Sequence, residues 1–157
     1  IKNVQRIATE LRPEVLDNLG LAEALRQEAS RFQQRSGVAC ELQLTSEQLN
    51  LPGPVTTAVF RVFQEALTNV GRHAKATLVR IVLEVDGEKL MLQVEDDGQG
   101  IRLDATTESR SLGLLGMRER ASVLGGEVTI SPISPQGTRV CLRLPRTATD
   151  AKFWADL

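Results

Sequence analysis

Glu65, Asn69 and His73 are spaced four residues apart in the stretch QEALTNVGRHA, so on a helix they form one row. The apolar residues around them predict that this row lies along the border of a buried stripe. Carboxylate and amide oxygens suit a hard cation such as Mg²⁺, which keeps water and phosphate oxygens as further ligands. A solvated charged helix face is the commoner use of such residues, so the row alone leaves both interpretations open.

Acids and glycines meet in the stretch VEDDGQGI, residues 94–101. A calcium-binding loop would need oxygen ligands at alternating positions, and Gln93 would be a poor first ligand. A dinucleotide-binding fingerprint would need a third glycine, but Leu103 occupies that position. Because Asp and Gly favour turns whatever they bind, the stretch by itself indicates a turn at the end of a strand.

A third candidate is SLGLLGMRER, which follows a polar stretch without periodicity at 99–112. A structureless loop of that length in a compact domain is usually a functional lid or a disordered segment. Gly113 and Gly116 are expected to flank the start of a helix. Helix N-termini attract phosphate, and glycine permits close approach and hinging. Ordinary helix capping explains the glycines equally well.

The hydrophobic pattern predicts the elements that would position these residues. Pro13 and Gly20 are expected to break or kink the first helical region, and Gly37 to cap it. Asp86–Gly87 is a strong signal for a hairpin between two alternating stretches. The expected helices are 1–36, about 55–74 and 113–124, and the expected strands are 38–44, 78–86, 89–96, 127–133 and 138–145.

The late strands are joined by hairpin turns rather than crossover helices, which predicts an α+β fold, a mixed or antiparallel sheet with helices on one face. The 157 residues, 41% hydrophobic and 25% charged, suit one domain with an appendage. A net charge of −1 argues against a nucleic-acid-binding surface built on bulk positive charge. Cys40 and Cys141 lie in alternating apolar runs and are expected to be buried thiols without metal-ligand spacing.

Four stretches in this order, QEALTNVGRHA, EDDGQGI, SLGLLGMRER and GTRVCLRLP, resemble the N, G1, G2 and terminal Gly-Thr boxes of histidine kinase ATP-binding domains. Those domains belong to the GHKL superfamily, whose Bergerat fold is a two-layer α/β sandwich. LRPEVLDNLGLAEAL resembles the second dimerisation helix of the nitrate-sensor-like subgroup, whose GMRER glycine box is also matched. The resemblance implies a helical stem and partial dimerisation region at 1–36, an ATP-binding catalytic domain at 37–147 and a tail at 148–157.

The resemblance also implies roles for individual residues. Asp96 would read the adenine amino group, Asn69 would bind magnesium, and Glu65 would be the catalytic carboxylate, as general base or to orient water. Ser111 departs from the pattern, because the glycine box usually has another glycine there. The further ATP-binding residues that the resemblance implies, besides Asn69 and Asp96, are Arg72, His73, Gly98, Gly100, Ile101, Gly113, Leu114, Gly116 and Thr138.

The implied protein is a bacterial two-component sensor kinase, an enzyme that takes Mg-ATP and phosphorylates a histidine on the dimerisation helix of its own homodimer, for relay to a response-regulator aspartate. His73 is the only histidine and lies inside the N box, so it is not assigned as the acceptor. The chain opens on Ile1 within a helical pattern, and we expect a cytoplasmic fragment that binds ATP without phosphorylating itself, whether or not its parent is anchored in the inner membrane. No direct nucleic-acid contact is expected. The alternative is an anti-sigma-factor-type serine kinase, or another GHKL ATPase that uses nucleotide as a conformational switch.

Overall fold

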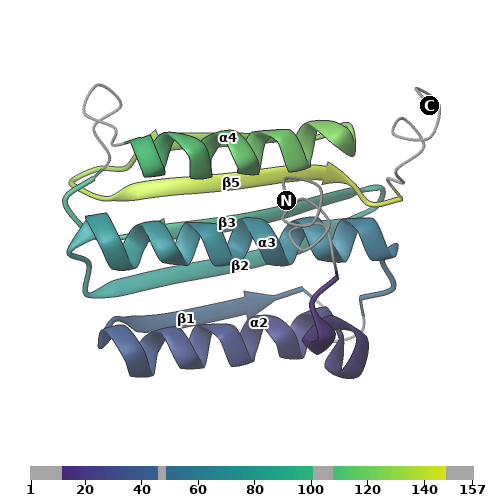
Figure 1. The fold of residues 1–157 in the computed structure, drawn as a ribbon, viewed down its shortest axis with the longest axis horizontal. Helices are drawn as coiled ribbons and strands as arrows, with labels where there is room; N and C mark the ends of the chain where they lie inside the picture. Colours follow the sequence, from purple (N-terminus) through teal and green to yellow (C-terminus); the bar gives the residue numbers. More distant parts are fainter. Residues whose placement is uncertain (1–11, 46–48, 101–107, 148–157) are drawn as a thin grey trace, which may run out of the picture.

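The protein is a two-layer sandwich of one five-stranded sheet and one layer of helices (Figure 1). The computed structural model describes residues 12–45, 49–100 and 108–147, with side chains of the last range described from Leu112 on. The helices are α2 (Glu14–Ser36), α3 (Gly53–Asn69) and α4 (Glu108–Val123), and a short π-helix, η1 (Val70–Ala74), continues α3. The strands are β1 (Ala39–Leu44), β2 (Leu78–Asp86), β3 (Lys89–Asp96), β4 (Glu127–Pro132) and β5 (Thr138–Pro145).

The sheet has the strand order β1-β2-β3-β5-β4 and is mixed, as expected from the sequence. β1 pairs with β2 in parallel, and the other neighbours pair antiparallel. The hairpin predicted at Asp86–Gly87 is confirmed, because Asp86 pairs with Lys89 and Gly87 takes the positive φ of 58° that a tight turn requires. A parallel neighbour needs a crossover, which α3 supplies between β1 and β2.

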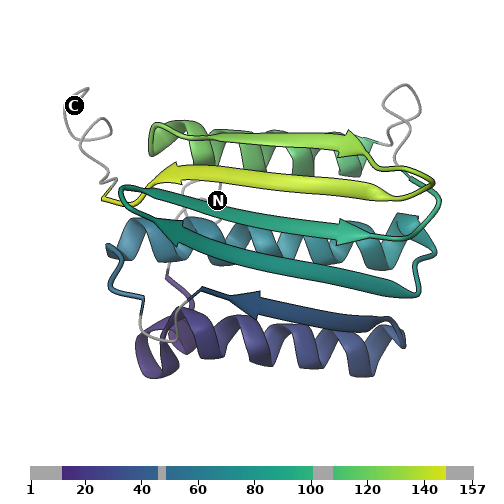
Figure 2. The same cartoon turned by 180° about the vertical axis from the view of Figure 1, so that it is seen from behind.

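In the described part of the chain, helices cover one face of the sheet and leave the other face open (Figure 2). Along β2 and β3, buried residues alternate with more exposed ones. The buried residues, such as Ile81 and Leu92, face α3. The open face carries charged cross-strand pairs instead, including Arg80 with Glu41 at 3.3 Å. The hydrophobic core therefore lies between the two layers. The apolar side of α3, which faces the sheet, forms a large part of this core.

α2 is interrupted at Gly20, where φ is 80° and the conformation is not helical, so the predicted break is confirmed. Its C-cap is Gly37 in the left-handed region, whose N–H donates to the Gln33 carbonyl at 2.9 Å, as expected. The apolar side of α2 packs against α3 and β1 and shares their core. This part of the predicted stem thus lies within the helical layer, while residues 1–11 are outside the described ranges and the boundary at residue 36 stays a prediction.

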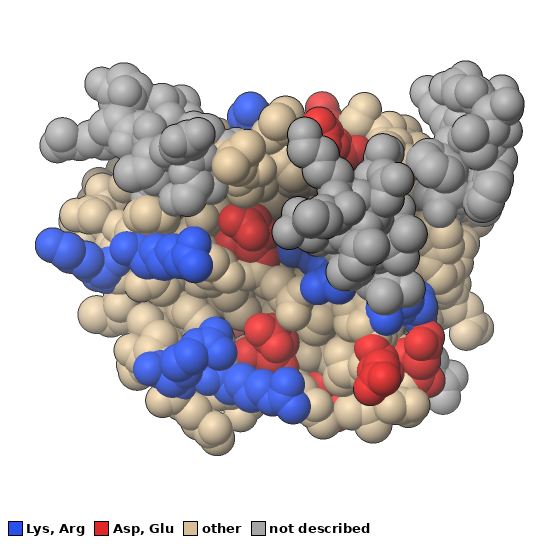
Figure 3. Space-filling view, viewed as in Figure 1, with Lys and Arg blue, Asp and Glu red and all other residues tan. Residues whose placement is uncertain are grey.

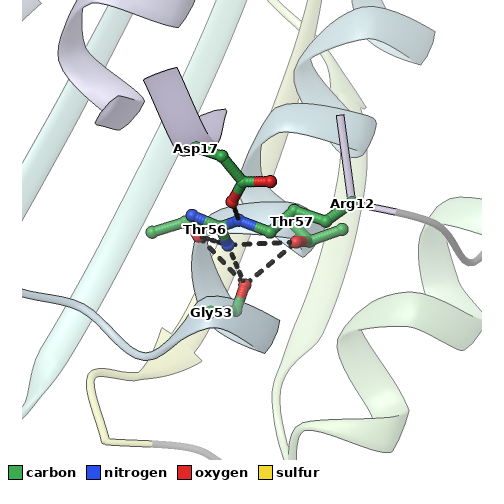
Figure 4. Close-up of polar contacts among 5 residues, drawn as sticks. All are labelled: Arg12, Asp17, Gly53, Thr56 and Thr57. Carbon is green, nitrogen blue, oxygen red and sulfur yellow. Dashed lines mark hydrogen bonds and ion pairs between the residues drawn. The ribbon is translucent and has the colours of Figure 1, made fainter. Parts of the chain in front are cut away.

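Arg12 ties the beginning of the described chain to the first turn of α3 (Figure 4). Its Nε donates to Asp17 at 2.5 Å, and its terminal nitrogen donates to the Gly53 carbonyl at 2.9 Å. The same nitrogen reaches the hydroxyl of Thr56 at 2.5 Å. No side-chain hydrogen bond caps the N-terminus of α3 at Pro52. The Arg12 guanidinium only donates, so it pairs with carbonyl and hydroxyl oxygens of the first turn and not with the N–H groups that a cap would bind.

α4 begins at Glu108, five residues before the start that the sequence predicted at Gly113. The prediction was wrong because the apolar pattern of the helix, whose buried face is formed by Leu114, Met117 and Ala121, begins only after residues 108–112. Packing of that face compensates for glycine in a helix, which costs about 1 kcal/mol relative to alanine. No helix in the described ranges is both long and apolar enough to cross a membrane.

Candidate functional site

The carboxylate of Asp96 is buried at the end of β3, with 6% of the residue exposed. Alternation along β3 directs Asp96 toward the helical layer, and the register places it opposite Thr138 of β5. Its Oδ1 accepts a hydrogen bond from the Gly98 N–H at 2.9 Å. Burial raises the pKa of Asp96 above its ordinary value, although backbone hydrogen bonds from Gly98 and Thr138 act in the opposite direction.

A small cavity of about 30 Å³ lies between the Asp96 end of the sheet and the helices. A cavity of this size has room for a water molecule and not for a purine ring. It must therefore widen to admit a base. Six of the residues that the sequence analysis singled out line it, namely Asn69, His73, Asp96, Gly100, Leu114 and Thr138. The other lining residues are apolar and were missed, because they follow the same periodicity as the core: Ala66, Val70, Ala74, Val94, Ile130 and Val140.

Two members of the polar row line the cavity, Asn69 from the end of α3 and His73 from η1. η1 carries Arg72 and His73 on a π-helical turn, a rare form that occurs frequently at functional sites. The predicted helical region to residue 74 is therefore confirmed in extent, but its last turn is wider than an α-helix. Gly71 is explained by a neighbour, because a Cβ there would lie 3.3 Å from the ring of Phe32 in α2.

Two glycines at the cavity let backbones approach closely. A Cβ on Gly98 would lie 2.2 Å from the Ala74 carbonyl oxygen of η1. A Cβ on Gly137 would lie 2.0 Å from the carbonyl oxygen of Asp96, and Gly137 has a φ of 126°. Gly137 was not among the predicted site residues, although its place before Thr138 in the sequence was a usable signal.

Gly113 lies against Glu65 rather than at a helix start. A Cβ on Gly113 would lie 2.1 Å from Oε1 of Glu65, so α4 covers this carboxylate closely. Because α4 begins at Glu108, the prediction that Gly113 and Gly116 flank a helix N-terminus is wrong. Nothing lies within 4 Å of a Cβ on Gly116, which does not line the cavity.

The remaining predicted residues differ in their placement. Arg72 is exposed on η1 and does not line the cavity, and Ile101 lies outside the described residues. Asn69 is half-buried and lines the cavity, and its amide oxygen suits magnesium chemically. Among the side chains that the structure describes, no group of three His, Cys, Asp or Glu could hold a metal ion.

The three consecutive acids point to different places. Glu95 lies on the open face of the sheet and pairs with Arg139 at 2.6 Å, as alternation predicts. Asp97 is exposed and accepts hydrogen bonds from Thr77, which together with a bond from the Leu78 N–H hold its pKa below the ordinary value. Only Asp96 enters the cavity.

The helical face also carries an uneven distribution of charge. Lys and Arg side chains gather on the side where η1 and the C-terminal part of α2 lie (Figure 3). The contact between Gly71 and Phe32 brings these two segments together. Their exposed basic residues are Arg31, Arg35, Arg72 and Lys75.

Comparisons with known proteins agree with this geometry. Residues 55–148 match the family of histidine kinase-, DNA gyrase B-, and HSP90-like ATPases. The chain is 40% identical over 144 residues to the histidine-protein kinase/phosphatase UhpB of Salmonella typhimurium, which covers 91% of this chain and 28% of that protein. It is 33% identical over 147 residues to the oxygen sensor histidine kinase NreB of Staphylococcus carnosus, covering 94% of this chain and 42% of that protein.

A solved structure gives the same result for the fold. The histidine kinase domain of the blue-light activated kinase EL346 from Erythrobacter litoralis superposes with a TM-score of 0.66 at 26% identity, covering 80% of this chain and 61% of that one. The chain thus spans less than half the length of the two curated relatives. It belongs to the family of histidine kinase-, DNA gyrase B-, and HSP90-like ATPases, and its ATP-binding domain is of the sensor histidine kinase type.

Proposed function

We propose that the cavity at Asp96 is the adenine end of an ATP site, and that the chain is the catalytic part of a two-component sensor histidine kinase. The observation that carries the proposal is the buried carboxylate at the end of β3, facing a cavity beside Gly98 and Thr138. A carboxylate oxygen accepts from an exocyclic amino group, which adenine offers and guanine lacks at the same ring position. The widened cavity would hold the base.

The phosphates would extend from the cavity toward the row on α3 and η1. Asn69 lies at the lining and offers an amide oxygen for magnesium, and the exposed Arg72 adds positive charge beside it. The surrounding excess of basic side chains would favour a triphosphate electrostatically (Figure 3). Magnesium held by Asn69 would neutralise negative charge on the phosphates.

Glu65 would be the catalytic carboxylate. It would accept the proton of the attacking histidine as a general base, or it would orient a water molecule. Glu65 lies one turn before Asn69 on the same helix row, on the side that α4 covers through Gly113. In the proposed reaction the P–O bond between the γ-phosphorus of ATP and its β–γ bridging oxygen breaks, and ADP leaves. The γ-phosphoryl group forms a P–N bond with a histidine on the dimerisation helix of the homodimeric parent and passes from there to a response-regulator aspartate. His73 lines the adenine-side cavity, so we propose that it binds nucleotide and does not accept phosphate.

Nucleotide affinity of single variants tests the site. Asp96→Asn replaces an acceptor oxygen by a donor that faces the adenine amino group, and we expect Mg-ATP to bind at least about tenfold more weakly, since hydrogen bonds to charged groups contribute about 1.5–3 kcal/mol. Asn69→Ala should weaken binding in magnesium and leave magnesium-free binding nearly unchanged. Isothermal titration calorimetry with a non-hydrolysable ATP analogue measures both.

The matched control is Glu95→Gln, which removes an acid from the neighbouring position of the same strand but on the open face. Its affinity should equal that of the wild type. Unchanged affinity in both Asp96→Asn and Asn69→Ala would contradict the proposed site. Stable transfer of labelled phosphate from ATP to His73 would contradict the assignment of that residue.

A further inference from the structure

The loop after β3 is fastened to the segment before β2 by hydrogen bonds from both of its ends. The Asp97 carboxylate accepts from the Thr77 N–H at 2.8 Å, from the Thr77 hydroxyl at 2.5 Å and from the Leu78 N–H at 3.0 Å. The Asp97 N–H donates to the Leu78 carbonyl at 3.2 Å. This exposed acid therefore has a defined set of donors within the chain.

Gln99 fastens the other end of the loop to η1. Its backbone N–H donates to the Ala74 carbonyl at 2.7 Å, and its side-chain amide donates to the His73 carbonyl at 2.6 Å. Between the two anchors, Gly98 lies directly against the same Ala74 carbonyl. We use the name clasp for the contacts of Asp97 and Gln99 with residues 73–78.

The clasp joins the loop that follows the buried carboxylate to the basic turn that continues α3. The loop carries Asp96, whose carboxylate is held separately by the Gly98 N–H. The segment on the other side carries Arg72 and His73 on a π-helical turn, which has a wider and rarer backbone winding than an α-helix. Hydrogen bonds across the junction fix the spacing between the buried carboxylate and this basic turn.

We propose that Asp97 and Gln99 are positioning residues for nucleotide binding, which hold the basic turn of η1 at the distance from Asp96 that an adenine nucleotide spans. This inference rests on the proposed function. Neither residue lines the cavity, so they act through the backbone of residues 73–78. Their loss affects the phosphate end of the ligand more than the base, because Asp96 keeps its own bond to Gly98.

The hydrogen-bond donors around Asp97 make asparagine an informative replacement. In Asp97→Asn the remaining amide oxygen can accept from the N–H groups of Thr77 and Leu78, and the new amide nitrogen can donate to the Thr77 hydroxyl. Asparagine thus preserves the geometry and removes the charge. Alanine removes all the side-chain contacts. A positioning role is rescued by asparagine, whereas a role in which the charge contacts the ligand is not.

The measurement is the ratio of the dissociation constants of adenosine and Mg-ATP, which reports how much the phosphates add to binding. NMR titration of the 157-residue chain gives both constants. We expect Asp97→Ala and Gln99→Ala to lower this ratio about tenfold, a coupling of about 1.4 kcal/mol, while Asp97→Asn stays within about twofold of the wild type. The control Asp86→Asn, at the far end of the β2–β3 hairpin, leaves the ratio unchanged.

A purely structural role would lower the melting temperature of the alanine variants and leave the ratio at its wild-type value, which would overturn the inference alone. A loss in Asp97→Asn as large as in Asp97→Ala would also overturn it. If Asp97→Ala does not fold, Gln99→Ala decides by the same criterion. A wild-type chain that binds adenosine and Mg-ATP equally weakly, or not at all, would overturn the proposed function together with the inference.

Discussion

The two ends of α3 use polar groups in opposite ways. At the N-terminal end of α3, Arg12 donates hydrogen bonds to the carbonyl of Gly53 and to the hydroxyl of Thr56, a residue that is only 5% exposed. At its C-terminal end, the helix widens into η1 beside a cavity, and a buried carboxylate faces that cavity with a raised pKa. Dense hydrogen bonding therefore marks a junction between segments, whereas a buried charge beside unfilled space marks a site for a ligand.

Replacing one glycine beside each end of α3 by alanine should give the largest difference in stability and nucleotide affinity. In Gly98→Ala the new Cβ meets the Ala74 backbone at 2.2 Å, so the loop and η1 must separate. Overpacking of this kind costs about 1–3 kcal/mol or more, and nucleotide binding should fall below detection. In Gly53→Ala the nearest atom to the Cβ is a terminal nitrogen of Arg12 at 3.4 Å, which is an ordinary contact.

Urea unfolding followed by circular dichroism compares the two variants, and calorimetric titration gives their nucleotide affinity. Gly53→Ala should change stability little, since alanine is also the better helix former. Equal loss of stability in both variants would mean that the close approach of Gly98 to Ala74 has no energetic consequence.

Removing the network at the N-terminal end should produce a smaller and purely structural effect. Arg12→Ala removes the donor to Gly53 and Thr56, and we expect the free energy of unfolding to fall by about 1 kcal/mol. ATP affinity should remain at the wild-type value, because the network lies at the opposite end of α3 from the cavity. A lower ATP affinity of this variant, measured at a temperature where it is fully folded, would contradict this expectation. It would show that the two ends of α3 are energetically coupled.

The smallest effect concerns pH, because adjacent acids shift in opposite directions. The pKa of Asp96 is raised above 3.8 by burial, so the folded state disfavours its charged form, and the group lowers stability as pH rises from 3.8 through the folded pKa. The pKa of Asp97 is lowered, chiefly by the Thr77 hydroxyl, so its contribution to stability is present above 3.8 and is lost as pH falls through the folded pKa.

Asp96→Asn should therefore gain stability relative to the wild type as pH rises above 3.8. Asp97→Asn should be less stable than the wild type above 3.8, and this deficit should disappear as pH falls below that value. Thermal unfolding of both variants across an acid-to-neutral series measures the difference. A parallel pH dependence of the two variants would contradict the opposite environments of these neighbouring carboxyls.

Sequence reasoning succeeded where the pattern is local. The strands at 78–86 and 89–96 were predicted with the observed bounds, because alternation and the Asp86–Gly87 turn are read from neighbouring residues. The start of α4 was missed because residues 108–112 precede the first buried residue of the helix, Leu114, and carry no apolar periodicity. The contact of Gly71 with Phe32 could not be predicted from local periodicity, since it joins residues of two helices that are far apart in the chain.

The candidate site was predictable only in part. Family resemblance singled out Asp96 and Thr138, but no spacing rule places two residues so far apart in the sequence opposite each other; the register of β3 and β5 does so. The contacts of Arg12 with Gly53 and Thr56 were not predicted, because these partners lie beyond a whole helix and strand. The clasp was also missed, since Asp97 reads in sequence as an ordinary turn residue.

The parallel pairing of β1 has a consequence for the order in which the molecule assembles. β2 and β3 meet across a two-residue turn, a closure of the kind that takes about microseconds, whereas β1 and β2 are separated in the chain by α3 and η1. Longer chain closures cost more entropy and slow folding. We therefore expect α2 and β1 to dock late, so that Phe32 reaches the π-helical turn of η1 only when the rest of the sheet already exists.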